Sequence, residues 1–240
     1  MTNPTPVHQI CLLNCFELRV RGDSVPVKAG SQRLVTFLAL HDGLLRRNFV
    51  AGALWPDVPP DRACANLRAS IWRVPPTCRT MIDLSARHIK LASGVTVDYS
   101  TAVTLARRLI DRSEKCDEHD LSVQAMAKLS SELLPACYDD WVLAEREQFR
   151  QLRLHALQVL CERLTARKRY GEAIDVGLAA VCAEPLRESS HRVLIKAHLA
   201  EGNNAEAHRQ YELYRQITRA ELSVEPSRNL LVSPRLDEQG

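Results

Sequence analysis

The stretch Asp61–Val74, DRACANLRASIWRV, decides the fold of the N-terminal part of this chain. Its apolar residues recur at i, i+4 and i+7, the spacing that puts side chains on one buried side of a helix: Leu67, Ile71 and Val74. Prolines at 59–60 favour a helix start, and prolines at 75–76 end it. The sequence therefore predicts one amphipathic helix between two proline pairs.

The opposite side of this helix carries the side-chain types that read DNA bases. Arginine and asparagine form paired hydrogen bonds with guanine and adenine edges in the major groove, and small alanines allow a close approach. An ordinary solvated face is the alternative interpretation of the same pattern. We predict base readout by Arg62, Asn66, Ala69 and Arg73, with Arg68 and Trp72 on one flank as backbone contacts.

Two shorter helices are predicted before this segment. Residues 34–41 carry a helical stripe that stops at Asp42-Gly43, and residues 48–55 form a second apolar pattern. The N-terminal amides of a helix favour an anion. The residues at the start of the second helix are therefore candidate phosphate contacts: Arg46, Arg47 and Asn48.

Short extended segments lie on both sides of the three helices. Residues 8–28 alternate in strand-like pieces, and residues 81–84, 88–91 and 95–98 read as a hairpin and a return strand. Three helices followed by a hairpin are typical of a winged helix-turn-helix, whose wing contacts the DNA backbone or minor groove. Three residues on the predicted wing are candidate contacts: Arg87, His88 and Lys90.

The rest of the chain is helical in period and contains an internal repeat. Residues 166–173 (ARKRYGEA) and 200–207 (AEGNNAEA) superpose at an offset of 34, which is the tetratricopeptide period. A plain helical bundle is the alternative. We expect a mainly α protein with small β elements: a winged-helix DNA-binding domain at 1–100 and an all-α, tetratricopeptide-like domain at 101–240.

Composition and charge agree with this division. The 240 residues are 45% hydrophobic and 25% charged, which suits a folded protein with one or two cores. Residues 1–100 hold 12 Lys and Arg against 7 Asp and Glu, whereas residues 101–240 hold 20 against 22. A nucleic-acid partner is therefore expected only for the first part. With no membrane-length apolar run and no secretory signal pattern, we expect a soluble protein of the cytoplasm, associated with the nucleoid.

Cysteine spacing and motif searches give no sign of a metal centre or an enzyme. The eight cysteines form no C-x-x-C pair, and we expect them to be reduced, small buried hydrophobes, with a redox or metal role as the alternative. No Walker-type, dinucleotide-binding or nucleophile-elbow motif occurs. We therefore expect no catalytic residues, no metal and no cofactor.

Several blocks in order along the chain resemble the Streptomyces antibiotic regulatory proteins. Those matching the DNA-binding half are 34–41, Leu54-Trp55-Pro56-Asp57, 65–68 with Ile71-Trp72-Arg73, and Val97-Asp98. Those matching the bacterial transcriptional activator domain are Tyr138-Asp139-Asp140-Trp141, Glu145-Arg146-Glu147, 184–188, 197–202 and 211–214. The resemblance covers roughly residues 10–226. Asn14-Cys15 departs from the Gly-Pro that the family places in the first strand turn.

The resemblance implies a winged helix of the response-regulator type and a helical activation domain. It implies a transcriptional activator that binds double-stranded DNA as a homodimer, or side-by-side pair, on direct repeats near the −35 promoter element. It also implies recruitment of RNA polymerase holoenzyme through the sigma factor and alpha subunit, and control of a secondary-metabolite, or antibiotic, gene cluster. Two alternatives stay open: a repressor with the same DNA contacts, and a tetratricopeptide-type adaptor for protein interactions.

Overall fold

The segment that decides the fold is a helix, α3 (Pro60–Trp72), in the computed structural model, which describes residues 7–111, 117–227 and 230. Pro60 takes a first-turn position, where its missing amide hydrogen costs nothing, and Pro75 follows the helix end. The buried stripe is Ala63, Leu67, Ser70 and, just beyond the helix, Val74. Ile71, predicted to lie on this stripe, is only half-buried, so the buried side is rotated toward Ala63 and Ser70.

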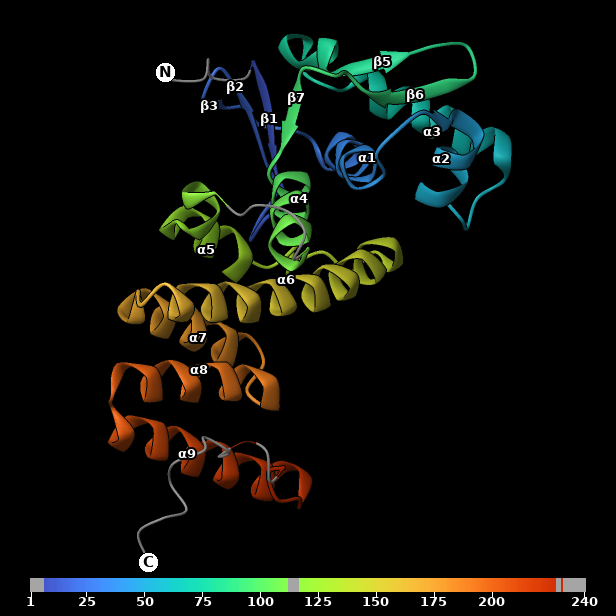
Figure 1. The fold of residues 1–240 in the computed structure, drawn as a ribbon. Helices are drawn as coiled ribbons and strands as arrows, with labels where there is room; N and C mark the ends of the chain where they lie inside the picture. Colours follow the sequence, from blue (N-terminus) through green and yellow to red (C-terminus); the bar gives the residue numbers. More distant parts are fainter. Residues whose placement is uncertain (1–6, 112–116, 228–229, 231–240) are drawn as a thin grey trace, which may run out of the picture. The chain divides into compact units, whose positions relative to one another are not determined.

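Three helices pack together around this stripe (Figure 1). They are α1 (Ala29–Leu40), α2 (Arg47–Leu54) and α3; α2 and α3 lie close to the predicted ranges, whereas α1 begins five residues before the predicted stripe. The Ser31 hydroxyl donates a buried hydrogen bond of 2.8 Å to the Ser70 carbonyl, which joins α1 directly to α3. The fully buried residues of the three helices include Leu34, Phe37, Val50, Leu54 and Leu67.

Two small sheets complete the winged helix. The first has the order β3-β2-β1-β7, with β1 (His8–Cys11), β2 (Glu17–Val20), β3 (Asp23–Ser24) and β7 (Val95–Val97). The second has the order β4-β6-β5, with β4 (Leu45–Arg46), β5 (Ile82–Leu84) after the short helix η1 (Pro76–Met81), and β6 (His88–Leu91). The predicted hairpin and return strand are confirmed, and β7 pairs parallel with β1.

Asp98 fastens the end of the first sheet. Its carboxylate accepts hydrogen bonds from the amides of Leu12 at 2.8 Å, Leu13 at 3.2 Å and Tyr99 at 2.7 Å. Burial raises the pKa of Asp98, whereas the amide bonds act in the opposite direction. The Val97-Asp98 block of the sequence therefore has a structural role, since it joins the last strand to the first.

Two compact units make up the chain, each described here by itself. The first comprises Met1–Ala102 and Glu132–Arg146, and the second comprises Val103–Ser131 and Glu147–Gly240. From the sequence, residues 132–146 are expected to belong to the domain 101–240. In the structure they cluster with the winged helix. The boundary between the units falls within α4 (Asp98–Ile110) and within α6 (Asp140–Ala166).

Hydrogen bonds to the first strand turn explain why residues 132–146 belong to the first unit. The amide of Asn14 donates to the Glu132 carbonyl at 2.6 Å, and the Glu132 amide donates to Asn14 Oδ1 at 3.1 Å. Asn14 has a φ of 69°, a left-handed conformation that asparagine adopts more readily than most residues. The departure from Gly-Pro at this turn is therefore compatible with a defined geometry.

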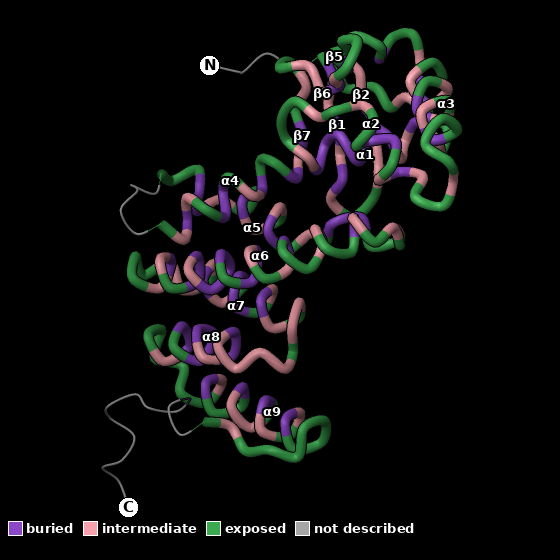
Figure 2. Tube along the Cα trace, turned by 90° about the vertical axis from the view of Figure 1, so that its right-hand side faces the viewer, coloured by how far each residue is buried: buried purple, intermediate pink, exposed green. Residues whose placement is uncertain are grey.

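The second unit consists of helices. After part of α4 come η2 (Glu118–Leu121), α5 (Val123–Ser130), part of α6, α7 (Tyr170–Ala183), α8 (Glu188–Glu201) and α9 (Asn204–Leu222). The starts of α7 and α9 are 34 residues apart, and Lys168 and Gly202, also 34 apart, both have positive φ, 61° and 92°. Figure 2 shows buried positions recurring along each of these helices. The winged helix followed by an all-α, repeat-containing domain is therefore confirmed.

Helix α7 lies close against α8 at Gly177. A Cβ added there would lie 3.0 Å from Leu194 Cδ1 and 3.3 Å from Leu194 Cα, so the two helices would have to separate. We expect Gly177→Ala to lower the free energy of unfolding by about 1–3 kcal/mol, as overpacked cores do. Urea unfolding followed by circular dichroism measures the change.

Gly171 on the same helix provides the matched control. A Cβ added there meets nothing within 4 Å, so Gly171→Ala should leave stability unchanged or raise it by up to about 1 kcal/mol through helix propensity. Equal effects of the two substitutions would contradict the close contact between α7 and α8.

Seven of the eight cysteines lie in the described part of the chain, and all seven are free thiols. The expectation that they are buried is wrong for most of them: Cys78 and Cys161 are buried, but Cys15 and Cys182 are exposed. Burial raises the pKa of Cys161 to about 12. Cys15 lies beyond β1 rather than in a strand, and Cys116 lies outside the described residues.

Candidate nucleic-acid interface

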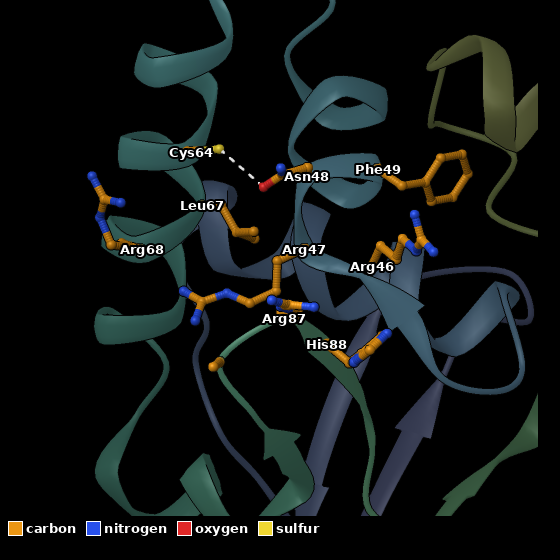
Figure 3. Close-up of a pocket in the computed structure, with 10 residues that line it drawn as sticks. Arg46, Arg47, Asn48, Phe49, Cys64, Leu67, Arg68, Arg87 and His88 are labelled. Atoms are coloured by element: carbon orange, nitrogen blue, oxygen red, sulfur yellow. Dashed lines mark hydrogen bonds between the residues drawn. The ribbon is translucent and has the colours of Figure 1, made fainter.

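A cationic groove lies on the first unit, between the start of α2, one flank of α3 and the turn of the wing (Figure 3). Its volume is about 920 Å³. We call it the basic groove and define it by the residues that line it: Arg46, Arg47, Asn48, Phe49, Cys64, Leu67, Arg68, Ala86, Arg87 and His88.

Backbone hydrogen bonds hold the wing against the start of α2. Strand β4 pairs with β6 so that Arg46 lies opposite His88, and the Arg47 amide donates to the Arg87 carbonyl at 2.9 Å. The Arg47 guanidinium also donates to the Ser85 carbonyl at 3.4 Å. Residues that are about 40 positions apart in the sequence therefore form one wall of the groove.

The other wall is a flank of α3. Cys64 and Arg68 stand one turn apart, and the Cys64 thiol lies 3.6 Å from Asn48 Oδ1 on α2. In Figure 3 the Arg47 guanidinium extends from α2 toward α3. Leu67, buried between the helices, forms the base of this side of the groove.

The charges of the basic groove are not neutralised locally. It is lined by four arginines and one histidine and by no Asp or Glu. Across residues 7–111, 117–227 and 230, none of the four arginines forms an ion pair. A low-dielectric groove with charge of one sign attracts and concentrates polyanions. Its chemistry therefore suits a phosphate backbone.

The residues predicted to contact phosphate are only partly brought together. Arg46, Arg47, Asn48, Arg68, Arg87 and His88 all line the basic groove. Lys90 does not; it faces Asp83 across the wing, with Lys90 Nζ 3.6 Å from a carboxylate oxygen. Their roles as contacts stay predictions.

The residues predicted to read bases lie elsewhere on α3 and do not line the groove. They share another side of the helix, on which Arg62 and Arg73 are exposed and Asn66 and Ala69 are half-buried. Ala65, between the two flanks, is exposed and small. The α3 surface therefore offers two cationic flanks on either side of an alanine.

Trp72 is the one aromatic residue of α3, and 73% of its surface is accessible. Its ring is covered on one face by the Arg79 guanidinium, 4.6 Å from the ring centroid, and Arg79 donates to the Trp72 carbonyl at 3.2 Å. Sequence reasoning missed Arg79, because it lies in η1 with no periodic pattern around it. It also missed Cys64, although the i, i+4 spacing to Arg68 places both on one flank.

The described residues contain no cluster of three or more His, Cys, Asp or Glu that could hold a metal ion. No helix in this part of the chain is long and apolar enough to cross a bilayer.

A winged helix with a cationic groove, joined to a helical-repeat domain, defines a class of bacterial transcription regulators, and the family comparison agrees. Residues 97–232 match the model of the bacterial transcriptional activator domain. The chain therefore belongs to this family, and its resemblance to the Streptomyces antibiotic regulatory proteins is confirmed. The family consists of transcriptional regulators, which are not a class of enzymes.

Two relatives extend the comparison. Regulatory protein AfsR of Streptomyces coelicolor (strain ATCC BAA-471 / A3(2) / M145) is 26% identical over 216 residues, which cover 85% of this chain and 22% of AfsR. The chain thus spans about a fifth of that relative. The structure of Mycobacterium tuberculosis EmbR, in complex with a low-affinity phosphopeptide, has a TM-score of 0.68 and 18% identity. The matched region covers 93% of this chain and 63% of EmbR, so the two proteins share a fold.

Proposed function

We propose that this regulator is a sequence-specific DNA-binding activator of transcription. In this proposal its winged helix binds direct repeats near the −35 promoter element, and a homodimer forms on the DNA. RNA polymerase is recruited through its sigma factor and alpha subunit, and the target is a secondary-metabolite gene cluster. The observation that supports DNA binding most strongly is the basic groove, whose four arginines form no ion pair within the described residues and lie beside a solvent-facing helix.

The dimensions of a duplex suit this arrangement. An α-helix with its side chains is about 10–12 Å across, and the major groove is about 12 Å wide. With α3 in the major groove, the strand backbone beside it would enter the basic groove between α3 and the wing. Arg46, Arg47, Asn48, Arg87 and His88 would then meet phosphates from one wall, and Arg68 would meet them from α3.

We assign base readout to the predicted set, Arg62, Asn66, Ala69 and Arg73. Arg62 and Arg73 are exposed and form no ion pair within the described ranges, so their guanidinium groups are available for guanine edges. The exposed Ala65 would allow close approach to the bases. Trp72 and Lys90 are assigned to the backbone at the far end of α3 and on the wing.

The helical unit is proposed to be the activating part. Stacked helical repeats form extended surfaces that suit protein partners, and the match to the bacterial transcriptional activator domain includes most of this unit. In vitro transcription with purified polymerase separates the activator from the repressor, because transcript yield rises for an activator and falls for a repressor.

Cys64 provides a direct test of where DNA binds. It lines the basic groove, so a bound duplex should slow its alkylation by iodoacetamide, because the reagent can no longer approach the thiol. We expect the full-length protein to show slower modification of Cys64 when saturated with promoter DNA. Peptide mass spectrometry measures the rate at each cysteine.

Two exposed cysteines serve as internal controls for this measurement. Cys15 lies on the strand side of the first unit and Cys182 at the end of α7, and both should react at the same rate with and without DNA. An unchanged rate at Cys64 on a fully bound duplex would show that DNA does not occupy the basic groove.

A further inference from the structure

A second groove on the first unit has the opposite charge. It has a volume of about 330 Å³ and lies between the segment that ends α2 and the start of α6. We call it the acidic groove and define it by Arg33, residues 53–58 and residues 138–141. Both walls belong to the same compact unit, although they are about 80 residues apart in the sequence.

Arg33 is the single cation that lines the acidic groove, and each of its three nitrogens donates to a residue of the groove walls. Arg33 Nε lies 3.1 and 3.0 Å from the two carboxylate oxygens of Asp139, and its Nη2 lies 2.7 Å from Oδ1. The third nitrogen of Arg33 donates to the Leu54 carbonyl. Arg33 therefore neutralises Asp139 and joins it to the end of α2.

Two further carboxylates in the groove have no cationic partner. Asp57 and Asp140 are exposed and form no ion pair with any residue of the described chain. Asp140 also lies in the first turn of α6, where the helix dipole favours a negative charge, but Asp57 lies in a loop and has no such role. The groove therefore carries a formal charge of −2, which excludes a nucleic-acid ligand and favours a cationic one.

Aromatic side chains line the same groove. Tyr138 has 79% of its surface exposed, and Trp55 and Trp141 are half-buried in the walls. The indole nitrogen of Trp141 is buried and has no hydrogen-bond partner among the described residues. Carboxylates beside aromatic faces are the surroundings that a guanidinium group prefers, since it pairs with the former and stacks on the latter.

We propose that the acidic groove is a docking site for an arginine-bearing segment of a partner protein. Its volume accommodates one or two side chains rather than a whole domain, so the partner would insert an arginine between Asp57, Asp140 and Tyr138. Aromatic pockets of this kind, which bury a cationic anchor, are typical of binding hot spots. This inference is independent of the proposed DNA contacts, which use the other groove.

The three tryptophans of the chain make the test site-specific. The full-length protein, labelled with ¹⁵N, is titrated with the capped peptide acetyl-Arg-Leu-Arg-amide while the three indole N–H signals are recorded. We expect the signals of Trp55 and Trp141 to shift, with a dissociation constant on the order of 1 mM or tighter. The signal of Trp72, on α3, should not move, because Trp72 does not line the acidic groove. Phenylalanine variants assign the three signals.

Peptide and protein variants separate stacking from simple charge attraction. The capped peptide with lysine in place of arginine should bind several-fold more weakly. The capped peptide with glutamate in place of arginine should not bind. Asp57→Asn, in a loop, should weaken the arginine peptide severalfold, and Asp140→Asn should add to this effect. Asp42→Asn, at another exposed loop carboxylate, is the matched control and should change nothing.

Three outcomes would overturn the proposal: equal shifts at all three indoles, equal affinity for the lysine and arginine peptides, or unchanged affinity in Asp57→Asn. Binding of promoter DNA by Asp57→Asn is measured in parallel and should equal that of the unmodified protein. Loss of DNA binding is thus distinguishable from failure of the acidic groove to bind the peptide.

Discussion

Replacing both Arg47 and Arg87 with glutamate is expected to reduce affinity for promoter DNA by on the order of 100-fold or more at moderate salt. These two residues converge on the basic groove from α2 and from the wing, and neither forms an ion pair in the described chain. Glutamate would place two negative charges against phosphates. Because phosphate contacts carry no sequence information, binding to random DNA should fall by a similar factor.

Fluorescence anisotropy over a range of salt concentrations measures this change. Loss of two phosphate contacts should reduce the slope of log affinity against log salt by about 2. Arg209→Glu, on α9, is the control, because its side chain is 79% exposed and lies outside the winged helix. If the double variant keeps the affinity and salt dependence of the unmodified protein, the basic groove does not bind the DNA backbone.

Replacing Arg146 with methionine is expected to lower the free energy of unfolding by about 3 kcal/mol. The Arg146 guanidinium donates to the carbonyls of Leu133, Leu134 and Cys137, which lie in a loop before α6. Methionine fills a similar volume but donates nothing, so the carbonyls of Leu133 and Cys137 would lose the Arg146 donor and that of Leu134 would keep only the Cys137 amide. Urea unfolding of the full-length protein measures the loss.

Two comparison variants define the cause of that loss. Arg146→Lys keeps the charge but cannot span three carbonyls, so its stability should lie between that of the unmodified protein and that of Arg146→Met. Arg209→Met removes an arginine whose nearest carboxylate contact is 3.7 Å and should change stability by less than about 0.5 kcal/mol. Equal effects of Arg146→Met and Arg209→Met would contradict a structural role for Arg146.

Local sequence patterns predicted the elements of both units, because helix and strand periods and prolines are visible within a few residues. The range of α3, the wing hairpin and the 34-residue repeat all follow from such patterns. The resemblance to a regulator family then placed these elements in one known order. Six of the predicted backbone contacts meet in one groove, as three helices and a wing would require.

Contacts between distant residues could not be predicted in this way. Arg33 and Asp139 are 106 residues apart, and this pair, with the Asn14–Glu132 bonds, draws residues 132–146 into the first unit. Strand β4 has two residues, too few to show any alternation, yet it aligns Arg46 with His88. The acidic groove was missed for the same reason: its walls meet only after folding.

The backbone bond from the Arg47 amide to the Arg87 carbonyl has a consequence for how the proposed complex would choose its DNA. The wall that this bond holds together through main-chain atoms has a nearly fixed shape before any ligand arrives, so little chain entropy is lost on binding. A wall of fixed shape also fits some duplexes better than others, since the groove width and bending stiffness of DNA vary with base sequence. In the proposed complex, base pairs that no side chain touches would therefore still influence affinity through the shape they give the strand backbone.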